Sequence, residues 1–161
     1  MNMEDIKEKA KQIIESNIYM TLATASKSGQ PWISPVFFVY DASYNLYWIS
    51  SKESRHSNLV RGNNKVAIVI FDSSAIEGEG DAVYLEAEAE EMNDESEIAE
   101  IAEIWNKRAT QEEFQVSGSD KVVGEAVWRI YRAKPYAVSK LGKGQYINGK
   151  YVDNREEISL K

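Results

Sequence analysis

The stretch Asn45–Phe71, NLYWISSKESRHSNLVRGNNKVAIVIF, decides the fold of this chain. Its residues 46–49 are aromatic and β-branched, which is typical of a strand, and residues 66–71 form a second, nearly continuous apolar strand. Between them a polar turn leads into a short helix, for which Ser54 is the expected N-cap and Gly62 the stop signal. The pattern therefore predicts a strand, a basic turn, a short helix and a buried strand.

The turn and helix of this stretch are basic although the chain is acidic. Residues 50–65 contain four cations and one anion, a local charge of +3 in a chain of net charge −7. Hydroxyls, a guanidinium and the free amides of a helix N-terminus, gathered at one strand end, suit a phosphate group. A solvated basic turn is the alternative interpretation, and the residues alone leave both open. The side chains concerned are Ser50, Ser51, Lys52, Arg55, His56 and Ser57.

Length and composition limit the class of protein. With 161 residues, 43% of them hydrophobic and 28% charged, the chain fits one globular domain over residues 1–161. Its apolar runs are only strand-length and its first 16 residues lack a signal-peptide core, so we expect a cytoplasmic protein that does not bind membranes. Having no cysteine excludes disulfides and thiolate catalysis, and a single histidine excludes multi-histidine metal sites. The net negative charge argues against nucleic-acid binding.

The segments on either side of the central stretch are helical or strand-like. Residues 5–16 place apolar side chains at helical spacing. Residues 19–25 and 32–40 are predicted strands, and Pro35 places the second of them near a sheet edge or a bulge. Residues 82–90 alternate strictly between apolar and polar, which predicts a half-buried strand whose glutamates face water.

An insertion follows this alternating strand. Asp94 is the expected N-cap of a helix whose apolar stripe includes Trp105, and a short second helix is expected to carry Phe114. Two more strands are predicted at residues 126–133 and 136–141, separated by a break at the intervening proline.

The C-terminal residues complete the pattern of a small β protein. Asn148-Gly149 lies between two strand-like segments and is a strong signal for a two-residue hairpin. The residues after this hairpin look like a loose tail. Six or more short, mostly antiparallel strands with a leading helix and an inserted helix pair predict a mainly β fold, a β-barrel with flanking helices. A β-sandwich also fits the pattern.

Five segments follow one another in a characteristic order and spacing: Tyr19–Thr24, Pro31–Phe38, Leu46–Ser50, Arg55–Leu59 and Asn63–Ala67. In this order and spacing the sequence resembles the FMN-binding split-barrel family, the pyridoxamine 5′-phosphate oxidase-like proteins, and most of all its small general-stress-type members. The resemblance covers residues 14–90 and, more weakly, residues 127–141. It implies a six-stranded antiparallel FMN-binding split barrel that forms a homodimer with the flavin at the subunit interface.

The resemblance also implies where the cofactor lies. In the family, the strand that corresponds to residues 34–39 lies along the isoalloxazine ring, and the end of the next strand meets the ribityl phosphate. Two basic residues clamp the phosphate, at the positions of Arg55 and His56. The oxidases have lysine at the second position, so the histidine implies a weaker or pH-dependent clamp, with Lys52 in place to compensate. The implied FMN-binding residues are Ser34, Pro35, Val36, Phe37, Trp48, Ile49, Ser50, Ser51, Lys52, Arg55, His56 and Ser57.

The function implied by the resemblance is that of an FMN-dependent oxidoreductase acting on a small-molecule substrate or electron donor. No catalytic side chain and no metal site is assigned. The tryptophan- and arginine-bearing C-terminal motif of true pyridoxamine 5′-phosphate oxidases is absent, so their vitamin B6 activity is not implied. Two alternatives stay open: a non-catalytic flavin-binding or storage module, and a split barrel that uses the deazaflavin F420 or haem. For haem, His56 is the only imidazole in the chain.

Overall fold

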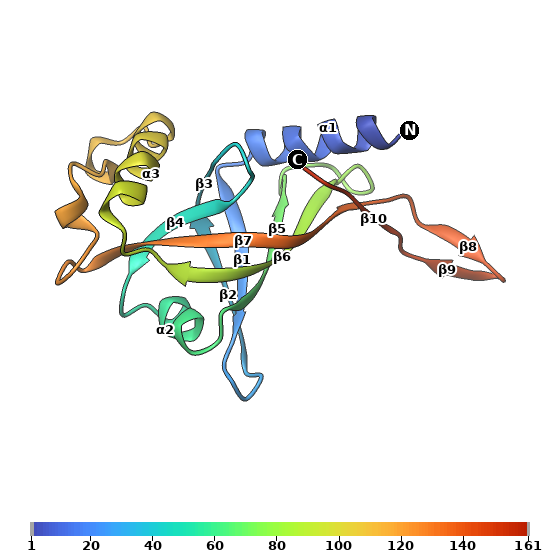
Figure 1. Cartoon of the computed structure of the whole chain (residues 1–161). Coiled ribbons are helices and arrows are strands. Elements are labelled where there is room, and N and C mark those ends of the chain that lie inside the picture. Colours follow the sequence, from blue (N-terminus) through green and yellow to red (C-terminus); the bar gives the residue numbers. More distant parts are fainter. Residues whose placement is uncertain (1, 161) are drawn as a thin grey trace.

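The structure, a computed structural model that describes residues 2–160, is a strongly curled antiparallel β-sheet surrounded by helices (Figure 1). Its main strands are β1 (Tyr19–Ala25), β2 (Pro31–Phe37), β3 (Val39–Tyr40), β4 (Leu46–Ser51), β5 (Lys65–Phe71), β6 (Ala82–Glu91) and β7 (Trp128–Leu141). They are hydrogen-bonded in the order β2-β1-β5-β6-β7-β4-β3.

The two outermost strands of this order are neighbours in the chain. Only Phe38 separates β2 from β3, yet β2 pairs with β1 and β3 pairs with β4. The sheet must therefore curl until its two edges meet at one bent segment of chain. Counted as one segment, β2 and β3 give six strands around the barrel. The prediction of a mainly β fold with a barrel-like sheet and flanking helices is confirmed.

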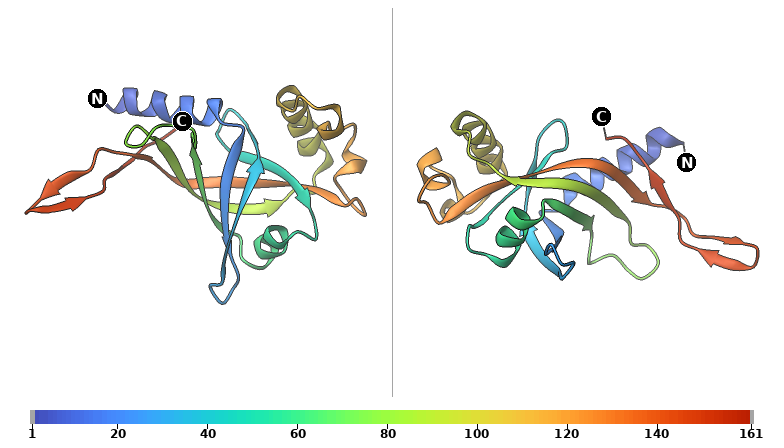
Figure 2. Two further views of the ribbon diagram at one scale, coloured as in Figure 1. Left: turned by 180° about the vertical axis from the view of Figure 1, so that it is seen from behind. Right: turned by 60° about the horizontal axis from the view of Figure 1, so that its bottom comes forward.

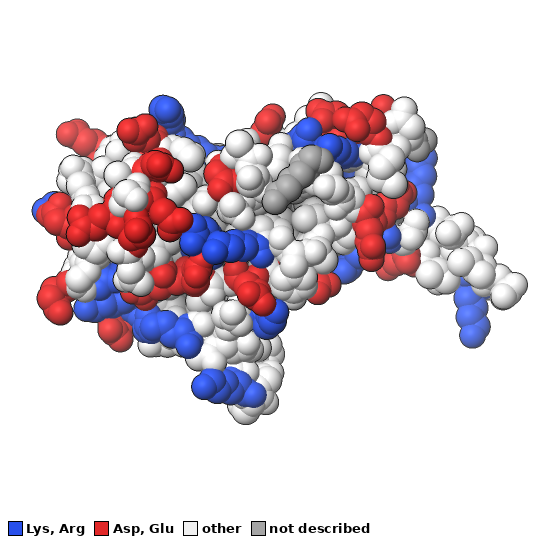
Figure 3. All heavy atoms as spheres, viewed as in Figure 1, with Lys and Arg blue, Asp and Glu red and all other residues white. Residues whose placement is uncertain are grey.

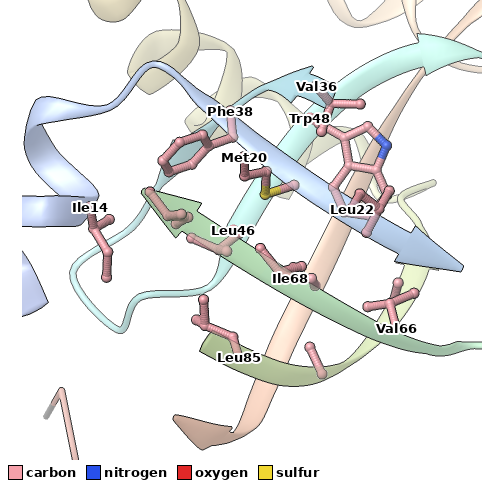
Figure 4. Close-up of a cluster of buried hydrophobic side chains, with 14 of the residues drawn as sticks. Ile14, Met20, Leu22, Val36, Phe38, Leu46, Trp48, Val66, Ile68 and Leu85 are labelled. Atoms are coloured by element: carbon pink, nitrogen blue, oxygen red, sulfur yellow. The ribbon is translucent and has the colours of Figure 1, made fainter. Parts of the chain in front are cut away.

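The inside of the curled sheet holds the main core (Figure 4). Strand alternation places Leu46 and Trp48 of β4 on this inner face, where both are fully buried. Burial of each such side chain contributes roughly 1.5–3 kcal/mol of hydrophobic stabilisation. The other large side chains of this core include Ile14, Met20, Leu22, Phe38, Ile68, Leu85 and Tyr131.

Helix α1 (Met3–Ser16) closes one side of the barrel. It begins with a capping box, in which the Asn2 side chain accepts from the Asp5 backbone N–H and the Asp5 carboxylate accepts from the Asn2 N–H. Its buried stripe of Ile6, Ala10 and Ile14 packs against β5 and β6. Among residues 2–160, no helix combines the length and apolar character needed to cross a membrane.

The insertion between β6 and β7 forms a small lobe on the outer side of the barrel (Figure 1). It contains α3 (Glu95–Arg108), whose N-cap Asp94 accepts from two backbone N–H groups, and two short 3₁₀ helices, η1 (Glu112–Phe114) and η2 (Ser119–Lys121). A second apolar cluster joins this lobe to the outer faces of β3, β4 and β7. Its buried members include Val39, Tyr47, Ile98, Ile101, Trp105, Val116, Val122 and Ile130.

Two predictions for the C-terminal third are wrong. The expected break at Pro135 does not occur, because the register of β7 against β6 shifts there and Tyr136 is left as an extra, bulged residue. The bulge accommodates the proline, and β7 continues as one strand. The expected loose tail instead forms β10 (Arg155–Glu157), which pairs with the end of β7, and Leu160 is buried in the main core.

The predicted hairpin is confirmed. Strands β8 (Gln145–Ile147) and β9 (Lys150–Val152) pair with each other and project from the body of the molecule as an arm (Figure 2). Asn148 and Gly149 at its tip have φ angles of 50° and 75°, as a type I′ turn requires.

Candidate functional site

A cavity of about 410 Å³ lies between the barrel and the inserted lobe. Three parts of the chain form its barrel side: the end of β2, the end of β4 and the first turn of α2 (Arg55–Gly62). The barrel residues that line it are Pro35, Val36, Phe37, Ile49, Ser50 and His56, with Tyr19 of β1 beside them. The other side is formed by Trp105, Glu113, Phe114, Gln115, Val116, Lys121 and Val122 of the lobe and by Trp128 at the start of β7.

The barrel side of the cavity is assembled by the stretch that decides the fold. Strand β4 ends at Ser51, the chain turns, and Ser54 caps α2 by accepting a hydrogen bond from the Ser57 backbone N–H. This sharp strand–turn–helix connection brings the helix start back beside the end of β4. The six barrel residues of the cavity all belong to the predicted FMN-binding set.

His56 connects β2, β4 and α2 at the cavity wall. Its Nε2 shares a hydrogen bond of 2.8 Å with the Ser50 hydroxyl, and its Nδ1 shares one of 3.2 Å with the Ser34 hydroxyl. The Ser54 hydroxyl lies 3.2 Å from Nε2. Burial lowers the pKa of the His56 imidazole below its usual value. The fold therefore favours the neutral ring, with both nitrogens engaged by serine hydroxyls.

The basic character of the turn is only partly neutralised. Arg61 and Lys65 form ion pairs with glutamates of β6. Lys52 and Arg55 form no ion pair with any residue from 2 to 160. Two free cations thus remain next to the serine–histidine cluster.

Arg55 is exposed but its guanidinium is positioned. The guanidinium carbon lies 4.1 Å from the ring centroid of Trp32 on β2, a cation–π contact. The Trp32 indole N–H in turn donates to the Ser34 hydroxyl at 3.0 Å. Trp32 thereby links Arg55 to the same hydrogen-bonded cluster as His56.

Strand β2 offers backbone groups as well as side chains to this cavity. It is an edge strand that pairs only with β1, so half of its N–H and C=O groups point away from β1. Its residues 35–37 line the cavity. The edge can therefore supply hydrogen bonds to the polar rim of a flat ligand.

Six residues of the predicted set do not line the cavity: Ser34, Trp48, Ser51, Lys52, Arg55 and Ser57. Ser34 contacts the cavity residue His56, and Lys52 and Arg55 lie on the turn and helix start described above. The other three are held elsewhere. Trp48 is wholly buried in the main core, where its ring stacks on Tyr131 with centroids 5.4 Å apart. Ser57 is also wholly buried, and its hydroxyl accepts from the Ser54 hydroxyl at 2.7 Å. The Ser51 hydroxyl accepts from the Glu53 backbone N–H within the turn.

The lobe side of the cavity was not predicted. Trp105, expected in a helical stripe, packs edge-to-face on Phe37 with centroids 4.9 Å apart and donates its indole N–H to the Phe114 carbonyl at 2.7 Å. Asn106 binds both the N–H and the C=O of Val116. The sequence predicts the inserted helix that carries Trp105. Its pattern does not show in which direction the loop after this helix folds back.

No group of three or more histidine or acidic side chains within residues 2–160 has the arrangement needed to hold a metal ion. The chemically useful features of the site are thus the cations, the hydroxyls, the neutral imidazole, the free strand edge and the aromatic walls. Such a set can bind a phosphorylated, flat, largely apolar molecule.

Comparison with known proteins identifies relatives of the chain. A family model described as pyridoxamine 5′-phosphate oxidase matches residues 6–131. No curated protein matches the chain.

Solved structures share the fold at low sequence identity. General stress protein 26 from Bacillus anthracis is 15% identical with a TM-score of 0.61, and the match covers 92% of this chain and 98% of that one. HutZ, a haem storage protein from Vibrio cholerae, is 18% identical with a TM-score of 0.66, covering 84% and 91%. A haem-binding protein from Mycobacterium smegmatis is 19% identical with a TM-score of 0.65, covering 92% and 57%. At such identities these likenesses establish the split-barrel fold alone.

Proposed function

The chain belongs to the pyridoxamine 5′-phosphate oxidase family, and on that premise we propose that it binds FMN in the cavity and acts as an FMN-dependent oxidoreductase on a small-molecule substrate. The observation that carries the proposal is the pair of unneutralised cations, Lys52 and Arg55, on the turn and helix start between the cavity residues Ser50 and His56; neither cation lines the cavity itself. A dianionic phosphate would neutralise both. The proposal goes beyond the family membership, because membership by itself does not identify the ligand.

The phosphate would lie where β4 meets α2. Arg55 presents a rigid donor fork, which suits phosphate oxygens better than the compact ammonium of lysine does. Ser50 and His56 line the cavity and supply a hydroxyl and a ring nitrogen within the same cluster. Binding of the phosphate would favour protonation of His56, since a neighbouring anion stabilises the imidazolium.

The isoalloxazine ring would lie along β2. The unpaired edge of residues 34–37 offers backbone hydrogen bonds to the polar atoms of the ring, and Phe37 with Trp105 gives it an apolar wall. When bound, the flavin supplies the hydride and electron transfer chemistry. The residues of this chain anchor its phosphate, orient its ring and exclude water from one of its faces.

Homodimer formation is part of the proposal. Strands β1 and β2 expose large apolar side chains: Tyr19, which lines the cavity, is 57% exposed, and Ile33 of β2 is 62% exposed. A second copy that covers this edge would bury these side chains and enclose the flavin at the interface.

Haem is the competing ligand, because two of the structural relatives are named for it. The number and the contacts of the histidines favour flavin over haem. His56 is the only histidine, and both of its nitrogens are engaged by serine hydroxyls, which an iron ligand would have to release.

The test is a set of parallel titrations of the purified protein with FMN, riboflavin, the deazaflavin F420 and haemin, followed by absorption spectroscopy and gel filtration. We expect stoichiometric FMN binding with a perturbed flavin spectrum, and weaker riboflavin binding because riboflavin lacks the phosphate. Rapid reduction of the bound flavin by NADH, NADPH or a substrate would support an enzyme over a storage module. Tight haemin binding together with no FMN uptake would overturn the proposal.

A further inference from the structure

We propose that the lobe side of the cavity is a second binding site, which holds a flat aromatic molecule without negative charge against Phe114 and Trp128. This molecule would be the substrate that meets the flavin. The inference rests on the proposed FMN binding, since the flavin would occupy the barrel side of the same cavity.

The aromatic side chains of the lobe side are unusually exposed for their size. Phe114 is 60% exposed and Trp128 is 55% exposed, although both line the cavity. Neither ring has an aromatic partner among residues 2–160. An exposed ring at a cavity wall, with no protein ring stacked on it, is suited to stack on a ligand ring.

Both rings are carried on firmly held backbone. Phe114 is tied to α3 by the hydrogen bond from Trp105 to its carbonyl. Trp128 pairs with Ser51 across β4 and β7, and the buried Arg129 side chain donates to the Trp128 carbonyl at 3.0 Å. This wall is therefore preformed, which lowers the entropy cost of binding.

The charge of the lobe selects the class of ligand. Residues 92–127 contain nine acidic and three basic residues, a net charge of −6 in a chain of −7. Acidic side chains gather over this part of the surface (Figure 3). At the cavity itself, Glu113 contributes a carboxylate, whereas the Lys121 ammonium is paired with Asp120 at 2.7 Å.

This distribution opposes the one at the barrel side. The free cations Lys52 and Arg55 lie on the turn and helix start that carry the barrel residues Ser50 and His56, whereas Glu113 lies in the lobe wall of the cavity. An anionic group is therefore favoured where the flavin phosphate would bind and disfavoured at the aromatic wall. A neutral ring fits the lobe side, and a sulfonated or phosphorylated one does not.

The experiment uses the full chain loaded with oxidised FMN and two probes that differ by one charge, 1,4-naphthoquinone and 1,4-naphthoquinone-2-sulfonate. Binding is measured from the perturbation of the flavin absorption band. The neutral probe should bind at least about threefold more tightly than the sulfonate, and Phe114→Ala and Trp128→Ala should each weaken its binding by about threefold to tenfold. Phe71→Ala is the control, because Phe71 is exposed on β5 and does not line the cavity. Phe114→Tyr keeps the ring and should retain probe binding.

The outcomes separate the two proposals. Failure of the wild-type protein to take up FMN would overturn the proposed function and this inference with it. FMN uptake with unchanged probe binding in both alanine variants, or equal affinity for the two probes, would overturn this inference alone. Glu113→Gln should reduce the difference in affinity between the neutral and the sulfonated probe. A larger difference in affinity would contradict the role given to the lobe charge.

Discussion

Replacing Arg55 by alanine should weaken FMN binding much more than riboflavin binding. A hydrogen bond from a charged donor to a phosphate contributes roughly 1.5–3 kcal/mol, which corresponds to about a 10- to 150-fold change in Kd. Arg55 is exposed, so water screens its charge and the lower part of this range applies, about 10- to 30-fold. Riboflavin has no phosphate, so its affinity should not change. Arg55→Lys should fall between alanine and wild type, because lysine keeps the charge but loses the fork.

The structure supplies a matched control for this experiment. Arg155 is also exposed and also lies over an aromatic ring, with its guanidinium carbon 4.0 Å from the Tyr84 centroid, but it does not line the cavity beside β2 and β4. Arg155→Ala should leave FMN affinity unchanged. Titration calorimetry or flavin fluorescence quenching gives the dissociation constants of FMN and riboflavin for the wild type and each variant. An equal loss for FMN and riboflavin in Arg55→Ala, or no loss for either, would refute the assignment of the phosphate to Arg55.

Three other predictions follow from the contacts around the site. Trp32→Ala should weaken FMN binding about two- to fivefold, because it removes the cation–π support of Arg55; unchanged FMN affinity would count against that support. Burial lowers the pKa of His56 in the folded protein. Below about pH 6.5 the unfolded chain therefore binds a proton at His56 that the folded protein does not, so the free energy of unfolding should decrease as the pH falls towards the folded-state pKa. In urea unfolding, the free energy of unfolding should decrease more between pH 8 and pH 5.5 for wild type than for His56→Asn. Equal decreases would contradict this role of His56. Asp41→Ala should destabilise the protein by about 2–4 kcal/mol in urea unfolding, because the carboxylate accepts from two backbone N–H groups, an amide and the Tyr47 hydroxyl. A loss below about 1 kcal/mol would show that the turn is held by other contacts.

The barrel side of the molecule was predictable because its signals are local. A strand that ends in Ser50, followed by a helix cap at Ser54, fixes the direction of the chain within a few residues. The same local pattern places Arg55 and His56 beside the end of β4. The local pattern does not determine to which face of the sheet each residue near the strand end points. For this reason Trp48 is in the predicted site, although the structure places it in the core.

The errors at the C-terminus have a different cause. Pro135 is unfavourable in a regular strand, and only the pairing partner shows that the register shifts there to accept it. In the same way, the final residues have little strand character of their own. They form β10 because the end of β7 offers an unpaired edge. This is an effect of tertiary structure, which the sequence of residues 155–157 does not predict.

The two sides of the cavity are under different physical constraints, and this explains why only one of them could be read from the sequence. Changing the register of β4 or the start of α2 would disturb the barrel, since the neighbouring residues Leu46 and Trp48 are core positions. The lobe touches the barrel through its own apolar cluster, which includes the cavity residues Trp105, Val116 and Val122. Its exposed cavity residues, such as Glu113 and Phe114, are under no such packing constraint. A fold built in this way can keep the barrel side of the cavity unchanged while the opposite wall changes. If FMN occupies the barrel side as proposed, the aromatic, acidic wall is the part of this chain that determines which molecule reaches the flavin.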